Sequence, residues 1–317
     1  MTAAPLRIVF FGTPDFALPT LDALLGSRHP VVGVVTQPDR PRGRGQQLRA
    51  GPVKARALTA GVTVLQPVSL KDASFIEALT ALRADLGVVA AYGKILTETI
   101  LAIPRLGMIN VHASLLPRYR GAAPIHRAVA AGDTVTGVTI MRVVRALDAG
   151  AMLASVRRPI GPDDTSEDVE RDLATSGAAL LVDTVERLAH GPIPEEPQDD
   201  SRASYAPRLS KEDGLVDWTQ PAGRIHDQIR GMRPWPGAYS YLNGERLILL
   251  RSTVDEASQP VGGPGTIMAA RGEVLRIATG AGTLLVRELQ SEGKRPMGTR
   301  EFLAGRRFTP GDRFGPP

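Results

Sequence analysis

The chain of 317 residues contains no cysteine. This absence excludes disulfide bonds and every metal site built on thiolate ligands, so a reducing compartment is easily tolerated. Aromatic residues make up only 4% of the chain, whereas 43% of its residues are hydrophobic. We therefore expect a large core built mainly from leucine, valine, isoleucine and alanine side chains.

Long hydrophobic runs are also missing. The apolar stretch near the start of the chain ends at Gly12, and it has neither the basic start nor the length of a signal peptide. No stretch approaches the roughly 18 consecutive apolar residues that span a bilayer. The five histidines show no metal-like spacing. We expect a cytoplasmic protein without membrane contact and without a bound metal.

The charge is unevenly placed along the chain. The net formal charge is +5, and residues 208–317 hold 16 Lys and Arg against 12 Asp and Glu. An anionic partner such as a nucleic acid would favour this basic excess. Ordinary solvated charge on an arginine-rich protein explains the same numbers.

Short apolar runs alternate with helical patterns over the first 190 residues. Such alternation is typical of right-handed βαβ crossovers, and it predicts an open, mostly parallel, Rossmann-like α/β sheet. The expected strands are 6–12, 31–38, 62–67, 86–93 and 107–114, and the expected helices are 16–27, 53–61 and 74–83.

The alternation of apolar runs and helical patterns ends near residue 190. Residues 191–207 contain four prolines and a cluster of acids, which predicts an extended linker. Beyond the linker, short strand-like runs separated by glycine-rich turns predict a small C-terminal β-barrel. We therefore expect a catalytic domain at 1–190, a linker at 191–207 and a barrel domain at 208–317. The barrel prediction rests on the strand-like runs 246–250, 265–270, 273–279 and 283–289. One helix is expected at 222–232.

Two polar residues, Asn110 and His112, lie near the end of the last strand expected in the sheet. Residues i and i+2 of a strand share a face, and open α/β sheets bind ligands at the carboxyl ends of their strands. An asparagine amide can stabilise an oxyanion, and a histidine exchanges protons near neutral pH. Neither residue is a nucleophile, and no Gly-x-Ser-x-Gly motif is present. The pair suits acyl-type transfer to a substrate that brings its own nucleophile, such as an amine.

A carboxylate is needed to orient and hold the imidazolium. Asp148 is the candidate, because it lies in a tight turn between the apolar runs 136–144 and 152–156. Taken alone, an Asn-x-His pair or an Asp-Ala-Gly turn is more often an ordinary structural feature. The Ser-Leu-Leu-Pro tract that follows His112 favours a functional site over an ordinary structural feature.

Eight segments together resemble the methionyl-tRNA formyltransferase family, which is one of the folate-dependent formyltransferases. The Asn-x-His pair with the downstream aspartate occurs in the wider group, whereas the tract at 109–128 and the C-terminal segments are typical of the tRNA enzymes. The similar segments are 10–17, 37–45, 90–96, 109–128, 147–153, 163–174, 205–218 and 229–239.

The resemblance implies a formyl transfer from 10-formyltetrahydrofolate to the amino group of initiator methionyl-tRNA. We expect the protein to be a monomer. The resemblance makes Asn110, His112 and Asp148 the catalytic trio. Segment 90–96 is similar to a wall of the family's pterin pocket, and the C-terminal part to an oligonucleotide-binding (OB-like) barrel that holds the tRNA. The folate-binding tract would be Ser114, Leu115, Leu116 and Pro117.

Basic residues are the candidate tRNA contacts. Arg44, with Arg42 beside it, lies in a basic stretch at 37–56, which we expect to be a mobile surface loop. The resemblance implies that Arg44 contacts the acceptor end of the tRNA. Lys294 and Arg295 are candidate phosphate contacts of the barrel, although both could simply face solvent.

Other functions remain open at this stage. A small-molecule formyltransferase acting on a sugar-nucleotide amine or on glycinamide ribonucleotide would use the same trio, and so would a formyl-folate hydrolase. A non-catalytic RNA-binding protein would have no need of the trio. A dinucleotide-binding dehydrogenase is disfavoured because the first strand lacks the Gly-x-Gly-x-x-Gly motif. The basic stretch at 142–145 also departs from the family pattern.

Overall fold

The computed structural model describes residues 3–42, 47–255, 257–306, 308 and 311–316. The chain divides into two compact units. The first unit comprises Met1–Pro124, Val135–Arg158 and Glu170–Ala206. The second comprises Ile125–Thr134, Pro159–Val169 and Pro207–Pro317. The boundaries expected from the sequence, at 190 and 207, stay a prediction.

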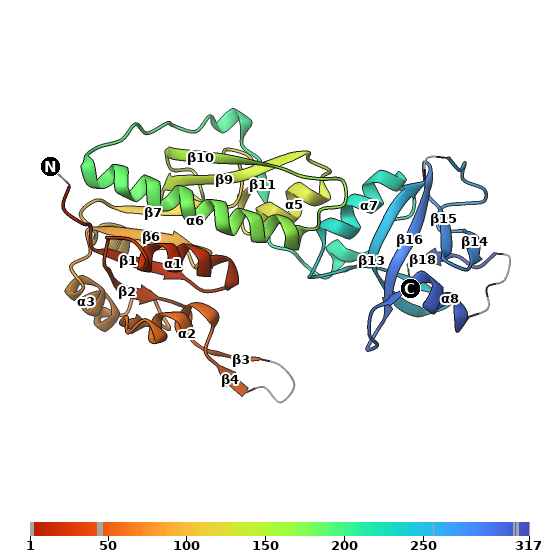
Figure 1. Cartoon of the computed structure of the whole chain (residues 1–317), viewed down its shortest axis with the longest axis horizontal. Coiled ribbons are helices and arrows are strands. Elements are labelled where there is room, and N and C mark those ends of the chain that lie inside the picture. The colour runs from red at the N-terminus through yellow and green to blue at the C-terminus, as the bar shows by residue number, and fades with distance from the viewer. Residues whose placement is uncertain (1–2, 43–46, 256, 307, 309–310, 317) are drawn as a thin grey trace. The chain divides into compact units, whose positions relative to one another are not determined.

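Seven strands form the sheet of the first unit in the order β10-β9-β7-β6-β1-β2-β5 (Figure 1). β1 pairs in parallel with β2 and β6, β2 with β5, and β6 with β7, whereas β9 runs antiparallel to β7. The mostly parallel sheet predicted from the sequence is confirmed. The strands are β1 (Ile8–Gly12), β2 (Val31–Val35), β5 (Val64–Leu65), β6 (Leu86–Ala90), β7 (Met108–His112), β9 (Val135–Arg142) and β10 (Met152–Pro159).

Apolar runs become the central strands because helices cover both faces of such a sheet. Every residue of β1 is buried, and four of the five residues of β6 are buried. The three helices expected from spacing are confirmed as α1, α2 and α3. The helices that start in the first unit are α1 (Leu18–Leu25), α2 (Pro52–Thr59), α3 (Ala73–Ala81), α4 (Glu98–Leu101) and α5 (Pro124–Ala130), with the short η1 (Asp15–Ala17) before α1.

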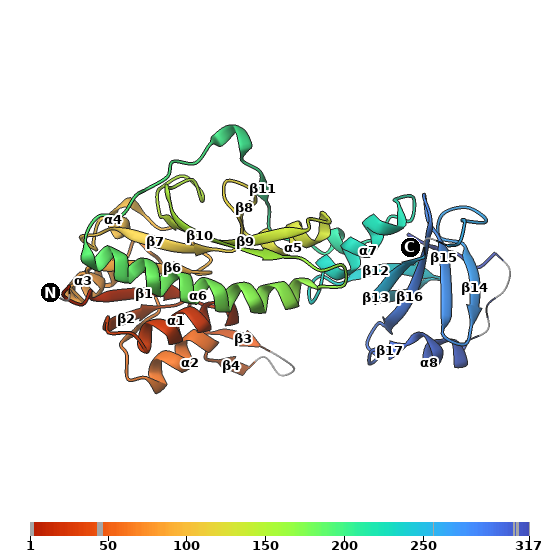
Figure 2. The same ribbon diagram turned by 45° about the horizontal axis from the view of Figure 1, so that its top comes forward.

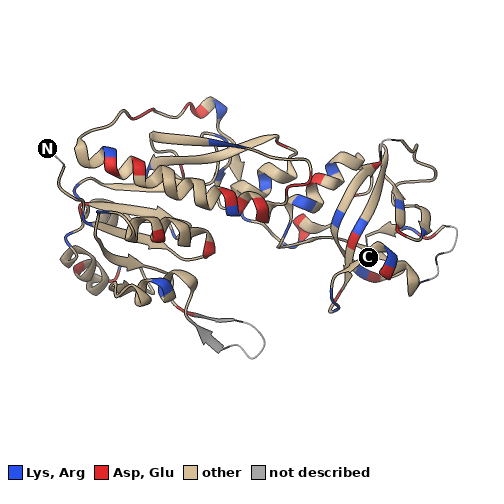
Figure 3. Cartoon of the chain, viewed as in Figure 1, with Lys and Arg blue, Asp and Glu red and all other residues tan. Residues whose placement is uncertain are grey.

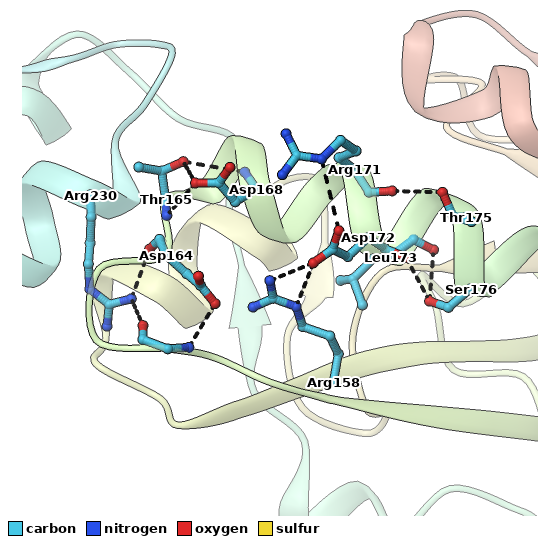
Figure 4. A network of polar contacts seen from close by, with 11 residues as sticks. Arg158, Asp164, Thr165, Asp168, Arg171, Asp172, Leu173, Thr175, Ser176 and Arg230 are labelled. Atoms are coloured by element: carbon cyan, nitrogen blue, oxygen red, sulfur yellow. Dashed lines mark hydrogen bonds and ion pairs between the residues drawn. The ribbon is translucent and has the colours of Figure 1, made fainter.

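Helix α6 (Ser166–His190) runs along one face of this sheet, as Figures 1 and 2 show. Gly177 lets the helix approach closely, since a β-carbon there would lie 3.0 Å from Cγ1 of Val111 in β7. Arg158 of β10 also donates a hydrogen bond of 2.6 Å to Asp172 of α6 (Figure 4). The contact of Gly177 with Val111 places the helix directly behind the strand that carries Asn110 and His112.

The basic stretch at 37–56 is not simply a loop, so that expectation was wrong. β3 (Arg40–Arg42) and β4 (Gln47–Arg49) pair antiparallel, and α2 begins at Pro52. Strands of three residues, rich in arginine and proline, are too short to produce a periodic signal.

Residues 191–206 contain little regular structure but are hydrogen-bonded to the rest of the first unit. Glu196 exchanges two backbone hydrogen bonds of 2.8 Å with Met152. After η2 (Asp200–Arg202), β11 (Tyr205–Ala206) pairs in parallel with β8 (Arg120–Gly121). A segment without apolar periodicity is therefore fixed by backbone contacts.

The second unit is an antiparallel half-barrel in which β14, β15, β16, β13, β12 and β18 pair in that order and β17 pairs with β16. The expected C-terminal β domain is confirmed in this form. Trp218 lies in its core, is only 4% exposed, and donates to Ser240. The elements are η3 (Glu212–Gly214), α7 (Ala222–Gly231), β12 (Ala238–Leu242), β13 (Glu245–Asp255), β14 (Ile267–Arg271), β15 (Val274–Ala278), β16 (Thr283–Ser291), β17 (Met297–Gly298), α8 (Thr299–Ala304) and β18 (Phe314–Gly315).

Two segments from the first 190 residues pack into the second unit. Arg127 of α5 forms a two-pronged contact with the carboxylate of Asp213, at 2.8 and 3.0 Å. Arg230 of α7 donates 3.0 Å to the backbone oxygen of Asp164 (Figure 4). No helix among the described residues is long and apolar enough to cross a membrane.

Candidate active site

The carboxyl ends of the central strands meet at one edge of the sheet. Gly12 of β1 pairs with Ala90 of β6, and Val89 pairs with Asn110 of β7. The following loops are joined by the backbone oxygen of Tyr92, which accepts 2.9 Å from Nε2 of Gln37. This is the edge at which open α/β sheets bind ligands.

Asn110 and His112 occupy alternate positions at the end of β7. Of the five residues of this strand, all of which the structure describes, only Asn110 is partly exposed. His112 is 5% exposed and pairs with Thr139 of β9. Solvent thus reaches the sheet at Asn110, next to a nearly buried imidazole.

The imidazole of His112 lies between two oxygen atoms, a backbone carbonyl and a carboxylate. Its Nε2 is 3.0 Å from the backbone oxygen of Tyr119, so the proton of this hydrogen bond belongs to Nε2. Its Nδ1 lies 3.7 Å from Oδ2 of Asp148, which is longer than a hydrogen bond. The Nδ1 edge is therefore the part of the ring left for reacting groups.

Asp148 lies in the turn between β9 and β10, and its carboxylate is anchored. Oδ2 accepts a hydrogen bond of 2.8 Å from the backbone N–H of Gly121, and the side chain is 15% exposed. The residue adopts a left-handed backbone with φ of 47°. Asp tolerates this conformation better than most residues, although it costs energy. The structure thus brings Asp148 and His112 together from distant parts of the chain.

A close approach of two chain segments shapes the same turn. A β-carbon at Gly150 would overlap the backbone oxygen of Arg142. Arg142 itself donates 2.8 Å to Glu195 and 2.8 Å to the backbone oxygen of Leu106, and Arg145 lies 3.4 Å from Glu98. The unusual basic residues before the turn therefore have local partners.

The tract from Ser114 to Pro117 forms the turn after β7. Ser114 is fully buried, and its hydroxyl donates 2.6 Å to the backbone oxygen of Arg118. Thr139 connects both ends of the turn, because its hydroxyl donates to Ser114 and accepts from the N–H of Leu116. Leu115 is partly exposed, whereas Leu116 and Pro117 are buried. These contacts give Ser114 a shaping role, and folate binding by the tract stays a prediction.

Segment 90–96, expected beside the pterin, contains side chains that face the core. Tyr92 is 2% exposed, its ring meets Phe11 edge-on at 5.4 Å, and burial raises the pKa of its hydroxyl to about 12. Leu96 belongs to the same buried cluster. Lys94 donates 3.0 Å to the backbone oxygen of Val68. The exposed residues of the segment are Ala91, Gly93 and Ile95, so a ligand here would meet mainly backbone and the Ile95 side chain.

The candidate tRNA residues are spread over both units. Arg42 ends β3, and Arg44 lies outside the described residues. Lys294 and Arg295 are exposed in the turn between β16 and β17, where Arg295 forms an ion pair with Glu301. In Figure 3, ribbon positions of Lys and Arg alternate with those of Asp and Glu along the strands and helices of this unit. Their role in tRNA binding stays a prediction.

The sequence did not indicate several residues that hold the candidate catalytic side chains in place. Tyr119 and Gly121 hold His112 and Asp148 through backbone atoms, which leave no mark in a sequence. Gln198 contacts the Asp148 turn from a proline-rich segment. The described residues include no group of three or more His, Asp or Glu that could hold a metal ion.

Comparison with protein families gives two matches. Residues 6–185 match the family described as formyl transferase, and residues 208–307 match the formyl transferase C-terminal domain. A methionyl-tRNA formyltransferase of Geobacter sulfurreducens is 46% identical over 98% of both chains. One of Citrifermentans bemidjiense is 47% identical over 98% of this chain and 96% of its own length.

Solved structures share the fold at low identity. An N-formyltransferase from Helicobacter canadensis, in complex with folinic acid and dTDP-3-aminofucose, has a TM-score of 0.69 at 17% identity, over 90% of this chain and 99% of its own. HypX from Aquifex aeolicus, in complex with tetrahydrofolic acid, has a TM-score of 0.65 at 17% identity. That match covers 95% of this chain and 47% of HypX.

Proposed function

The chain belongs to the formyl transferase family, and from this membership we propose that it formylates the amino group of methionyl-tRNA with 10-formyltetrahydrofolate as donor. The observation that carries this function is similarity at 46% identity over 98% of the chain, through both units, to methionyl-tRNA formyltransferases. The protein is thus a folate-dependent enzyme whose product serves translation initiation.

The three side chains at the edge of the sheet suit the transfer of a formyl group. A partly exposed amide, an imidazole and an anchored carboxylate surround the end of β7. The substrate amine attacks the formyl carbon of the folate, the bond from that carbon to N10 breaks, and N10 takes up a proton as the amine loses one. The protein therefore needs neither a nucleophile of its own nor a metal, and we infer that it uses none.

Asn110 donates a hydrogen bond to the formyl oxygen as negative charge develops there. Amide donors of this kind act strongly because they are already in place when the charge forms. The free Nδ1 edge of His112 shares this oxyanion or exchanges the proton that leaves the amine. Asp148 stabilises the positive charge that the ring then carries. At 3.7 Å from Nδ1, the carboxylate acts through its charge and leaves room for the reacting group at this edge.

The remaining assignments extend this proposal. Ser114, Leu115, Leu116 and Pro117 form the turn beside the donor group of the folate. Arg42, Arg44, Lys294 and Arg295 contact the phosphates of the tRNA, because basic side chains supply most of the affinity for nucleic acids. The protein acts as a cytoplasmic monomer on initiator tRNA, with a catalytic domain at 1–190, a linker at 191–207 and a tRNA-binding domain at 208–317.

A substrate panel tests the function. The purified protein and labelled 10-formyltetrahydrofolate are incubated with methionyl-tRNA, with uncharged tRNA, with glycinamide ribonucleotide and with an amino-sugar nucleotide. Transfer of label to methionyl-tRNA alone is the expected result. Transfer to a small amine but not to methionyl-tRNA would contradict the proposal, and release of labelled formate without an acceptor would indicate a hydrolase.

A further inference from the structure

One amide side chain, that of Gln198, holds the turn that carries Asp148. Its Nε2 donates to the backbone oxygens of Asp148 and Gly150, each at 2.8 Å. Its Oε1 accepts from Nε and Nη2 of Arg120, at 3.0 and 2.8 Å. Both hydrogens and the oxygen of the amide are thus used, and the guanidinium can face only the oxygen end.

Arg120 links this amide to the candidate catalytic pair. It lies in β8 and is only 4% exposed. The residue before it, Tyr119, accepts the hydrogen bond from His112, and the residue after it, Gly121, donates to Asp148. Three consecutive residues therefore contact the imidazole, the amide of Gln198 and the carboxylate.

The turn depends on such external contacts. Asp148 has a left-handed backbone, and strained conformations persist only where the surroundings enforce them. The two carbonyls that Gln198 serves would lose this donor if its amide were removed. Because a catalytic group must be held within a fraction of an ångström, loosening of this turn affects the reaction directly.

We propose that Gln198 is a positioning residue for formyl transfer. Its two donated hydrogen bonds hold the Asp148 turn so that the carboxylate stays on Gly121 and faces Nδ1 of His112. Arg120 fixes the orientation of the amide. This inference rests on the proposed function for its kinetic test, and it gives the segment between the two matched family regions a role in catalysis.

Two substitutions test the proposal. Gln198→Glu keeps the shape and the contact with Arg120 but replaces the donor with an oxygen that repels both carbonyls. Gln198→Met keeps the size, removes every hydrogen bond and adds no charge, so it serves if the glutamate variant fails to fold. Gln228→Glu and Gln228→Met are matched controls, because Nε2 of Gln228 donates 3.0 Å to two backbone oxygens, those of Asp213 and Leu215 in the second unit.

The first measurement is steady-state formylation. Both Gln198 variants should lose about tenfold or more in kcat, with each KM within about threefold of the wild type, because a supporting residue changes the reacting geometry rather than substrate binding. The Gln228 variants should keep kcat within about twofold. A smaller loss for the Gln198 variants, or an equal loss for the controls, would overturn the proposal.

The second measurement does not depend on activity. Hydrogen exchange of the Gly121 amide reports whether Asp148 still accepts its hydrogen bond. Exchange should be faster in both Gln198 variants and unchanged in the Gln228 controls. Unchanged exchange at Gly121 in the Gln198 variants would refute the positioning role. A wild type that formylates nothing would instead refute the proposed function, and the exchange result would still decide the role of Gln198.

Discussion

Asp148→Asn should reduce formyl transfer while the fold stays intact. The amide oxygen of asparagine can still accept the hydrogen bond of 2.8 Å from Gly121. Asparagine also tolerates the left-handed backbone at φ of 47°. The substitution therefore removes the negative charge that faces His112 and changes little else.

The separation of the two side chains sets the size of the effect. Opposite charges at the 3.7 Å that separates Nδ1 of His112 from Oδ2 of Asp148 interact by about 4 kcal/mol at an effective dielectric constant of about 20. If this attraction is felt only when the ring is charged in the transition state, its loss slows the reaction by up to about 10³-fold. We expect kcat to fall between about tenfold and this limit, because solvent and relaxation weaken the interaction.

The assay is formylation of methionyl-tRNA at saturating folate, with the KM of each substrate measured separately. Asp172→Asn is the control, because Asp172 is also a carboxylate of the first unit, bonded at 2.6 Å to Arg158 (Figure 4). This control should keep kcat within about twofold. A loss of less than tenfold in Asp148→Asn would refute the reasoning, and so would an equal loss in the control.

Three further predictions concern the oxyanion, the turn and the second unit. Asn110→Ala should lower kcat by about 10²-fold with little change in tRNA binding, as measured by formylation and filter binding, since it removes one preorganised donor. Gly150→Ala should lower the melting temperature and abolish most activity, because the new β-carbon would overlap the backbone oxygen of Arg142; unaltered melting would contradict the close approach. Hydrogen bonds from Arg127 hold the pKa of Asp213 below its usual value. The ionised carboxylate therefore stabilises the fold at every pH above the ordinary pKa of aspartate, and this stabilisation is lost as the pH falls through the lowered pKa. Asp213→Asn should therefore cost about 1 kcal/mol in urea unfolding at pH 7 and progressively less in acid, and a cost independent of pH would contradict the ion pair.

Local patterns made part of the site predictable. The alternation of strand residues indicated that Asn110 and His112 share a face, and two apolar runs indicated the turn that carries Asp148. In each case the information lies within a few residues. The same holds for the parallel strands, whose apolar runs reflect burial on both faces of the sheet.

Contacts between distant segments could not be predicted in this way. Gln198 lies 50 residues from Asp148 and 78 residues from Arg120, in a segment without periodicity. Arg127 and Asp213 are 86 residues apart, and their contact belongs to the second unit although Arg127 precedes residue 190. Such contacts depend on where the folded elements meet, and no local spacing encodes that position.

The most direct test of the central claim is the transfer of labelled formyl from 10-formyltetrahydrofolate to initiator methionyl-tRNA, with elongator methionyl-tRNA measured beside it. The wild type should place the label on the amino group of the initiator species, and an Asn110→Ala, His112→Ala double variant that still binds tRNA should fail to do so. A wild type without transfer, or a double variant as active as the wild type, would contradict the account.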